Sequence, residues 1–186
     1  MNEVRLPPWL GGIEVGEALE IGWMLEIPLR FAKIEDALFA VLAQVATSES
    51  RSDHLCVTSS KLSMFHAKLA REFAEFSGNS TPIGLNLPDA GRLRLDDSIR
   101  AIGRISDLDE LAILGVLDGV VNPTLVAALA QIGKLSAPAA GGNLVWLCRS
   151  ARHNYQECMA LTDGYRRNLN SAILEGFSAL SGGIGL

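Results

Sequence analysis

The fold is decided first by residues 17–46, EALEIGWMLEIPLRFAKIEDALFAVLAQVA, in which apolar side chains recur at helical spacing. The members of this apolar stripe are Trp23, Met24, Ile27, Phe31, Ile34, Leu38, Val41, Leu42 and Val45. Spacings of three and four residues place these side chains on one face of a helix, which must be buried against other elements. The phase continues across Pro28, so we expect either one kinked helix or two helices stacked end to end.

Three further long segments repeat this periodicity. We expect helices over residues 55–76, 107–132 and 144–169, with residues 171–180 either extending the last helix or forming a fifth. The third of these begins with two capping signals and contains one breaking signal. Asp107 stands at the N-cap, Glu110 stands in the capping-box position, and Asn122-Pro123 predicts a kink.

The connections between these helices differ in length. Residues 47–53 and 133–142 predict short loops, whereas residues 79–106 are interrupted by prolines and glycines. The interrupting residues are Pro82, Gly84, Pro88 and Gly91. A connection of this length suits a crossover from one end of a bundle to the other, with a short helix over 96–105.

The whole chain, residues 1–186, therefore predicts one all-α domain. Its architecture is a four-helix bundle with a long crossover between helices 2 and 3, in the ferritin-like order rather than a simple up-down-up-down order. Residues 1–14 predict an irregular N-terminal arm and residues 181–186 a loose tail.

Composition excludes several classes of protein. The 186 residues carry a net charge of −5, which argues against non-specific binding to a nucleic-acid backbone. Three cysteines without a C-x-x-C pair predict neither a disulfide framework nor a zinc knuckle. The N-terminus lacks the basic start and apolar core of a signal peptide, so we expect a cytoplasmic protein.

One segment has the length and composition of a membrane span. Residues 111–132 are nearly all apolar, but Asp118 lies near their middle and Pro123 follows it. A charged aspartate at mid-span costs about 2.5–3.5 kcal/mol on insertion scales. We therefore expect a buried central helix of the bundle and no membrane span. Gly115 and Gly119 in this helix are interpreted as sites of close helix packing.

Two histidines follow a serine by three residues, reading SMFH from Ser63 to His66 and SARH from Ser150 to His153. In this order of helices the chain resembles the ferritin-like superfamily over residues 17–169. Within the superfamily, it is most similar to actinobacterial proteins that resemble the tRNA-modifying di-iron hydroxylases of the MiaE kind. The resemblance implies oxidation at bound iron or manganese and tRNA as a partner.

The resemblance also implies where metal ligands would lie. Di-iron proteins of this class supply one carboxylate each from helices one and three, and Glu-x-x-His from helices two and four. The corresponding residues are Glu35 with Glu26 as runner-up, His66 with Ser63, Asp118 with Glu110 as runner-up, and His153 with Ser150. Serine stands where both second carboxylates should be, so the predicted centre is degenerate.

Helical phase, at about 100° per residue, provides an independent criterion for which of these candidate ligands face the core. His66 and Asp118 fall inside the apolar arcs of their helices, and Glu35 lies at the flank of its stripe, whereas His153 points outward. The predicted metal site therefore consists of Glu35, His66 and Asp118, holding iron or manganese. Among polar side chains of the fourth helix, those predicted to face inward are Tyr155, Thr162, Cys148 and Cys158.

Structural interpretations of the same residues remain open at this point. His66 fits a hydrogen-bonded core histidine, and Asp118 fits pairing with His66 or with an arginine. The alternative function is then a non-enzymatic helical module that binds a partner or forms a homodimer. Its predicted interface is exposed apolar surface around Trp9, Trp23 and Trp146.

Overall fold

The computed structural model describes residues 10, 21–78, 89–136 and 142–182, and every regular element in these ranges is helical. The elements, in chain order, are α1 (Ile21–Ala46), α2 (Asp53–Gly78), α3 (Asp89–Gly103), the 3-10 helix η2 (Arg104–Asp107), α4 (Glu110–Val116), the π turn η3 (Leu117–Val121), α5 (Asn122–Ser136) and α6 (Gly142–Gly182). The all-α prediction is confirmed for these residues.

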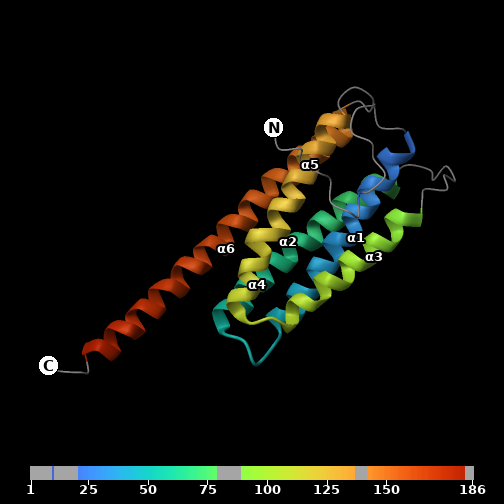
Figure 1. Cartoon of the computed structure of the whole chain (residues 1–186). Helices are drawn as coiled ribbons and strands as arrows, with labels where there is room; N and C mark the ends of the chain where they lie inside the picture. The colour runs from blue at the N-terminus through green and yellow to red at the C-terminus, as the bar shows by residue number, and fades with distance from the viewer. Residues whose placement is uncertain (1–9, 11–20, 79–88, 137–141, 183–186) are drawn as a thin grey trace.

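Two helical hairpins form the body of the molecule (Figure 1). One consists of α1 and α2, and the other consists of α5 and α6. The hairpins meet where α2 packs against α6, and α3 lies along α1. The far part of α6 extends beyond the other helices toward the C-terminus (Figure 1).

Contacts at one end of the bundle show how the hairpins are connected. Ser52 Oγ, just before α2, donates a hydrogen bond of 2.6 Å to Glu110 Oε1 at the start of α4. Arg51 Nη2 donates to the carbonyl oxygen of Ser106 at 2.9 Å. Helices α2 and α4 therefore begin at the same end, and the connection between them returns to that end. This connection contains α3, a longer helix than the one predicted over 96–105.

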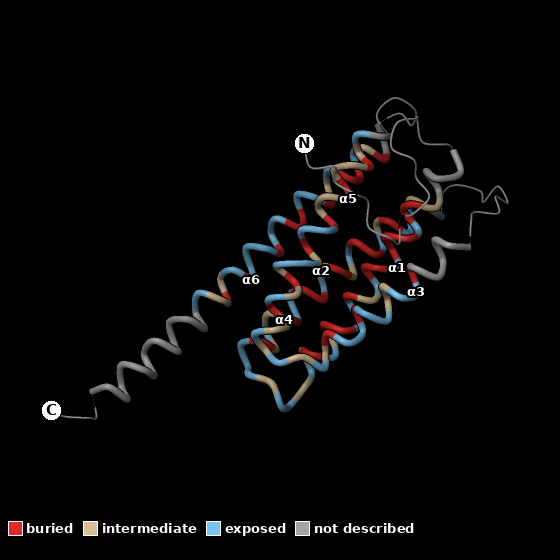
Figure 2. The backbone as a smooth tube through the Cα atoms, in the orientation of Figure 1, coloured by how far each residue is buried: buried red, intermediate tan, exposed pale blue. Residues whose placement is uncertain are grey.

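The core lies between the inner faces of the two hairpins (Figure 2). Phe31 of α1 stacks on Phe73 of α2 with ring centroids 5.0 Å apart, and both rings are fully buried. Pro28 lies inside α1, which continues past it as one helix, so the alternative of two stacked helices is wrong. The apolar stripe predicted for the first helix is buried from Ile27 to Val45.

The start of the third predicted helix differs from expectation. The N-cap is Asp109, whose Oδ1 accepts a hydrogen bond from the backbone N–H of Ala112 at 2.8 Å. Asp107, the predicted cap, instead ends η2. With Asp109 as the N-cap, Glu110 is the first residue of α4 and not the third, so it does not close a capping box. Its carboxylate instead accepts the hydrogen bond from Ser52. The predicted break near Pro123 is present as the π turn, which immediately precedes α5.

Other boundaries are also corrected. Residues 133–136 belong to α5 rather than to a loop. Of the two alternatives for residues 171–180, extension of the last helix is confirmed, because α6 runs as one helix to Gly182. Residues 181–182 end α6 and are not a loose tail, whereas residues 183–186 lie outside the described residues. The predicted arm, residues 1–14, also lies outside them apart from Leu10, which is buried.

Among the described residues, Glu110–Lys134 is long and apolar enough to cross a membrane, by length and composition only. One such helix is weak evidence for a membrane protein, because core helices of soluble proteins pass the same test. Only 33% of the residues in the apolar stretch of this segment are buried. The segment is thus a rod of α4, η3 and α5 with one buried face, which corrects the expectation of an enclosed central helix.

Candidate functional site

Three helices bring a carboxylate, an imidazole and a phenol together in the core. Glu35 of α1 is 0% exposed, His66 of α2 is 1% exposed and Tyr155 of α6 is 0% exposed. His66 Nδ1 lies 2.7 Å from Glu35 Oε2, and the Tyr155 hydroxyl donates a hydrogen bond to Glu35 Oε1. Both carboxylate oxygens therefore have a partner, as a buried carboxylate requires. We refer to these residues as the buried triad.

The environment of the triad keeps Tyr155 protonated. Burial raises the pKa of Tyr155 well above its usual value, and the nearby Glu35 carboxylate raises it further. Burial, reinforced by Glu35, likewise raises the pKa of Cys158 on the same helix. Tyr155 is therefore a hydrogen-bond donor to Glu35 at any physiological pH.

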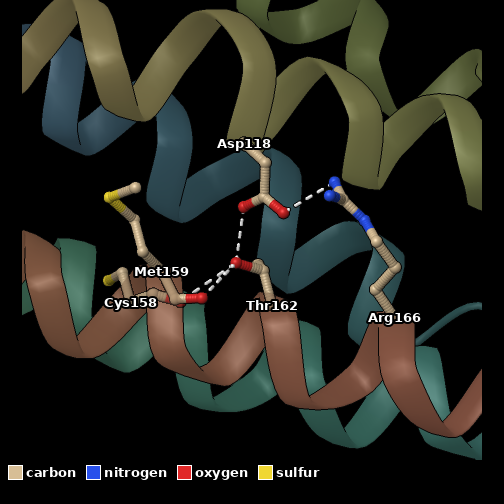
Figure 3. A network of polar contacts seen from close by, with 5 residues as sticks. All are labelled: Asp118, Cys158, Met159, Thr162 and Arg166. Atoms are coloured by element: carbon tan, nitrogen blue, oxygen red, sulfur yellow. Dashed lines mark hydrogen bonds and ion pairs between the residues drawn. The ribbon is translucent and has the colours of Figure 1, made fainter.

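Two of the predicted ligands meet, and the third has other partners. Glu35 and His66 are in contact, as expected of the ligands that the ferritin-like resemblance implies on the first and second helices. Asp118, in the π turn, faces α6 instead (Figure 3). Its Oδ1 lies 2.5 Å from Thr162 Oγ1, and its Oδ2 accepts a hydrogen bond of 2.8 Å from Arg166 Nη2. Of the structural alternatives for Asp118, pairing with an arginine is therefore confirmed.

The remaining positions of the predicted centre do not add ligands. Ser63 Oγ donates to the backbone carbonyl of Ser60 at 2.8 Å, within its own helix. His153 is exposed, as its helical phase predicted. Glu26, the runner-up on helix one, accepts a hydrogen bond of 3.1 Å from Arg30 Nε. These side chains are therefore engaged elsewhere or directed away from Glu35.

The arrangement can be compared with what a metal ion needs. Iron and manganese sites require several oxygen and nitrogen ligands with free lone pairs. In the described part of the chain, no three His, Cys, Asp or Glu side chains form a group that could hold a metal ion. Glu35 contacts His66 and Tyr155, whereas Asp118 contacts Thr162 and Arg166, so the residues as placed do not bring together the ligands of a two-metal centre. The site of Glu35, His66 and Asp118 stays a prediction.

Some residues of the core were not singled out from the sequence as partners. Tyr155 was expected to face inward, and it does, but nothing in its position along the chain identifies Glu35 as its acceptor. Arg30 is buried within α1, and the only sequence signal for it is Glu26 four residues earlier. The inward direction of Thr162, Cys148 and Cys158 is confirmed by their burial.

Exposed apolar residues form the second kind of candidate site. Trp146 is 68% exposed, as its position off the stripe of α6 predicted. Trp9 and the side chain of Trp23 lie outside the described residues. A Cβ atom added at Gly115 or Gly119 would have no neighbour within 4 Å, so these glycines do not serve close packing within the described chain.

The site thus combines a closed polar core with apolar surface on α4, η3 and α6. The closed core offers internal hydrogen bonds, and the surface offers area for a partner. Comparison of the chain with protein-family models, with curated proteins and with solved structures finds no match to any of them.

Proposed function

We propose that this chain is a non-enzymatic helical module that forms a homodimer through the outer face of Glu110–Lys134. The observation that carries the proposal is the mismatch between composition and burial in this segment. It is apolar enough for a membrane span, yet only 33% of the residues in its apolar stretch are buried. A large exposed apolar area on a soluble bundle is a common mark of an interaction surface.

The side chains on this face support contact with a second helix. Leu111 and Val120 are 57% and 59% exposed, respectively. Gly115 and Gly119 are exposed on the same rod, with nothing within 4 Å of where a Cβ would lie. Spacings of four residues place Leu111, Gly115 and Gly119 on one side of the rod, and Val120 lies about a quarter-turn further round its exposed part. Small residues flanked by branched apolar ones let a second backbone approach closely, and a two-fold dimer is the commonest closed assembly.

The buried triad supports the non-enzymatic half of the proposal. Glu35, His66 and Tyr155 are at most 1% exposed, so a substrate has no access to them without opening of the bundle. In this proposal the three residues have a structural role, since their mutual hydrogen bonds fix how the three helices pack in the core. In this proposal the architecture is ferritin-like and the protein is cytoplasmic, with the polar core replacing a metal centre.

The proposal is tested by the mass of the particle in solution. Sedimentation velocity of the full chain should give a dimer at micromolar concentration. Val120→Glu should dissociate it, because the charge would be desolvated in the interface. Met64→Glu is the matched control, since Met64 is 71% exposed on α2, and it should leave the dimer intact.

Three results would contradict the dimer proposal. A wild-type chain that is monomeric at all concentrations, or a Val120→Glu variant that remains dimeric, removes the face as an interface between copies. Binding of the wild-type monomer to lipid vesicles, lost in Val120→Glu, would assign the same face to a membrane instead.

The second candidate is metal-dependent oxidation, and the contact between Glu35 and His66 favours it. These residues lie on the first and second helices, where the ferritin-like resemblance implies ligands for iron or manganese. By the same resemblance the substrate would be tRNA. Metal content after expression with iron and manganese supplied should then be near-stoichiometric and fall in His66→Ala. The control is His153→Ala on the surface of α6. Equal metal content in all three proteins, or none in any, would count against this function.

A further inference from the structure

A pocket of about 260 Å³ lies between α5 and α6, away from the buried triad. Its lining residues are Leu129, Ala130, Gly133, Lys134, Val145, Cys148, Arg149 and Arg152. Helices α5 and α6 come close together at this pocket because Gly133 of α5 has no side chain. A Cβ added at Gly133 would lie 3.7 Å from Cys148 Cβ.

The pocket gathers positive charge in an acidic protein. Lys134, Arg149 and Arg152 line it, and all three are exposed to solvent. None of the three forms an ion pair with an acid of the described chain, whereas Arg166 pairs with Asp118 further along α6. The chain as a whole has a net charge of −5. Three cations that converge on a concave surface create a local field that attracts anions.

The base of the pocket is apolar and uncharged. Leu129 is buried there, Ala130 and Val145 are half-buried, and Cys148 is buried between the helices. Burial raises the pKa of the Cys148 thiol to about 12, although the charge of Arg152 opposes the shift. Cys148 is therefore neutral at physiological pH and places no negative charge beneath the three cations.

We propose that this pocket binds a small molecule that carries a phosphate group and a short apolar part. Two guanidinium groups can each donate paired hydrogen bonds to phosphate oxygens, and an ammonium group adds a further point charge. Three positive charges suit the double negative charge of a phosphate monoester. The volume falls just below the usual range of ligand pockets, which limits the apolar part to about the size of one ring.

Calorimetric titration of the full chain with three probes tests the chemistry. Phenyl phosphate carries both features, inorganic phosphate carries only the charge and benzyl alcohol carries only the ring. We expect phenyl phosphate to bind with one site per chain and more tightly than inorganic phosphate, and benzyl alcohol not to bind. All titrations are made at one low ionic strength, because surface charges are screened by salt.

Charge-removing variants connect binding to the pocket. Arg149→Gln and Arg152→Gln should each weaken phenyl phosphate binding about tenfold, because each removes a charge-assisted contact. Arg104→Gln is the matched control, since Arg104 is an exposed arginine on η2, and it should bind as the wild type does. Thermal unfolding of each variant verifies that the bundle is intact. Absence of saturable binding by any phosphate probe, or equal binding by all variants, overturns the proposal.

A second arm distinguishes the source of the phosphate. Vesicles of phosphatidylcholine with phosphatidic acid present the group on a lipid, and phosphatidylcholine vesicles alone serve as the control. Cosedimentation with the first only, reversed by phenyl phosphate and weakened in Arg152→Gln, assigns the pocket to a lipid headgroup. Saturable binding of phenyl phosphate without cosedimentation assigns it to a free phosphate ester.

Discussion

Replacing Tyr155 with phenylalanine removes one hydroxyl group from the centre of the molecule. That hydroxyl donates to Glu35, whose carboxylate is fully buried and has His66 as its other partner. A hydrogen bond to a charged group contributes about 1.5–3 kcal/mol, and its loss leaves a buried acceptor without a donor. For a domain of this size, each kcal/mol lowers the melting temperature by about 2–4 °C. We therefore expect Tyr155→Phe to melt about 3–12 °C below the wild type.

The matched control is Tyr165→Phe on the same helix. Tyr165 is also buried, but its hydroxyl lies 3.4 Å from the neutral Ser52 Oγ, so its loss should cost no more than about 1 kcal/mol. Urea unfolding followed by circular dichroism gives both free energies. A double-mutant cycle with Glu35→Gln should show a coupling of about 1 kcal/mol or more with Tyr155→Phe. If Tyr155→Phe is no more destabilising than Tyr165→Phe, Glu35 does not depend on the phenol and the reasoning fails.

Four further predictions concern α5, α6 and the cysteines. Gly133→Ala should raise the free energy of unfolding by about 0.5–1 kcal/mol in urea titrations, because the added methyl group meets Cys148 at an ordinary 3.7 Å; a loss would mean that the helices cannot accept it. Thr162→Val should lower the same free energy by about 1 kcal/mol through its lost contact with Asp118, and no change would dismiss that contact as stabilising. The pKa of Cys148 is about 12 in the folded chain and about 9 when unfolded, so only the unfolded thiol ionises between these pH values. The free energy of unfolding should therefore fall by up to about 1.4 kcal/mol per pH unit as the pH rises between them, and less steeply in Cys148→Ala. A thiol reagent at pH 8 should label Cys56 before the buried cysteines, as peptide mapping would show, and early labelling of Cys148 would contradict its burial.

Much of the fold could be predicted from the sequence because amphipathic helices show their buried face as a period. The stripe containing Leu38 and Leu42 predicted α1, and both residues are fully buried. The period was less useful for α3, where glycine and charged residues interrupt it. That helix is held by the burial of Leu95 and Ile102 and by its packing along α1, and such tertiary contacts outweigh local preference.

The candidate site could be predicted only one helix at a time. Polar residues on apolar stripes identified Glu35 and His66, because a polar group in a core must have a partner. The identity of a partner on another helix depends on how far one helix is shifted along the next. That shift determines that Tyr155 reaches Glu35, and that Asp118 meets Arg166 rather than His66. Periodicity within one helix carries no information about it.

The π turn between α4 and α5 has a consequence for changes of chain length. Deleting one residue from Leu117–Val121 removes the extra residue that widens this turn and restores an ordinary helix. Four residues of ordinary helix turn through about 400°, close to the rotation of five residues in a π turn, so Leu114 and Leu129 can still occupy the core together. A deletion at Thr124 in α5 has no widened turn to draw on, and it rotates everything after it by about 100° relative to everything before it. The rod therefore tolerates loss of a residue at the π turn and not in the ordinary helix that follows.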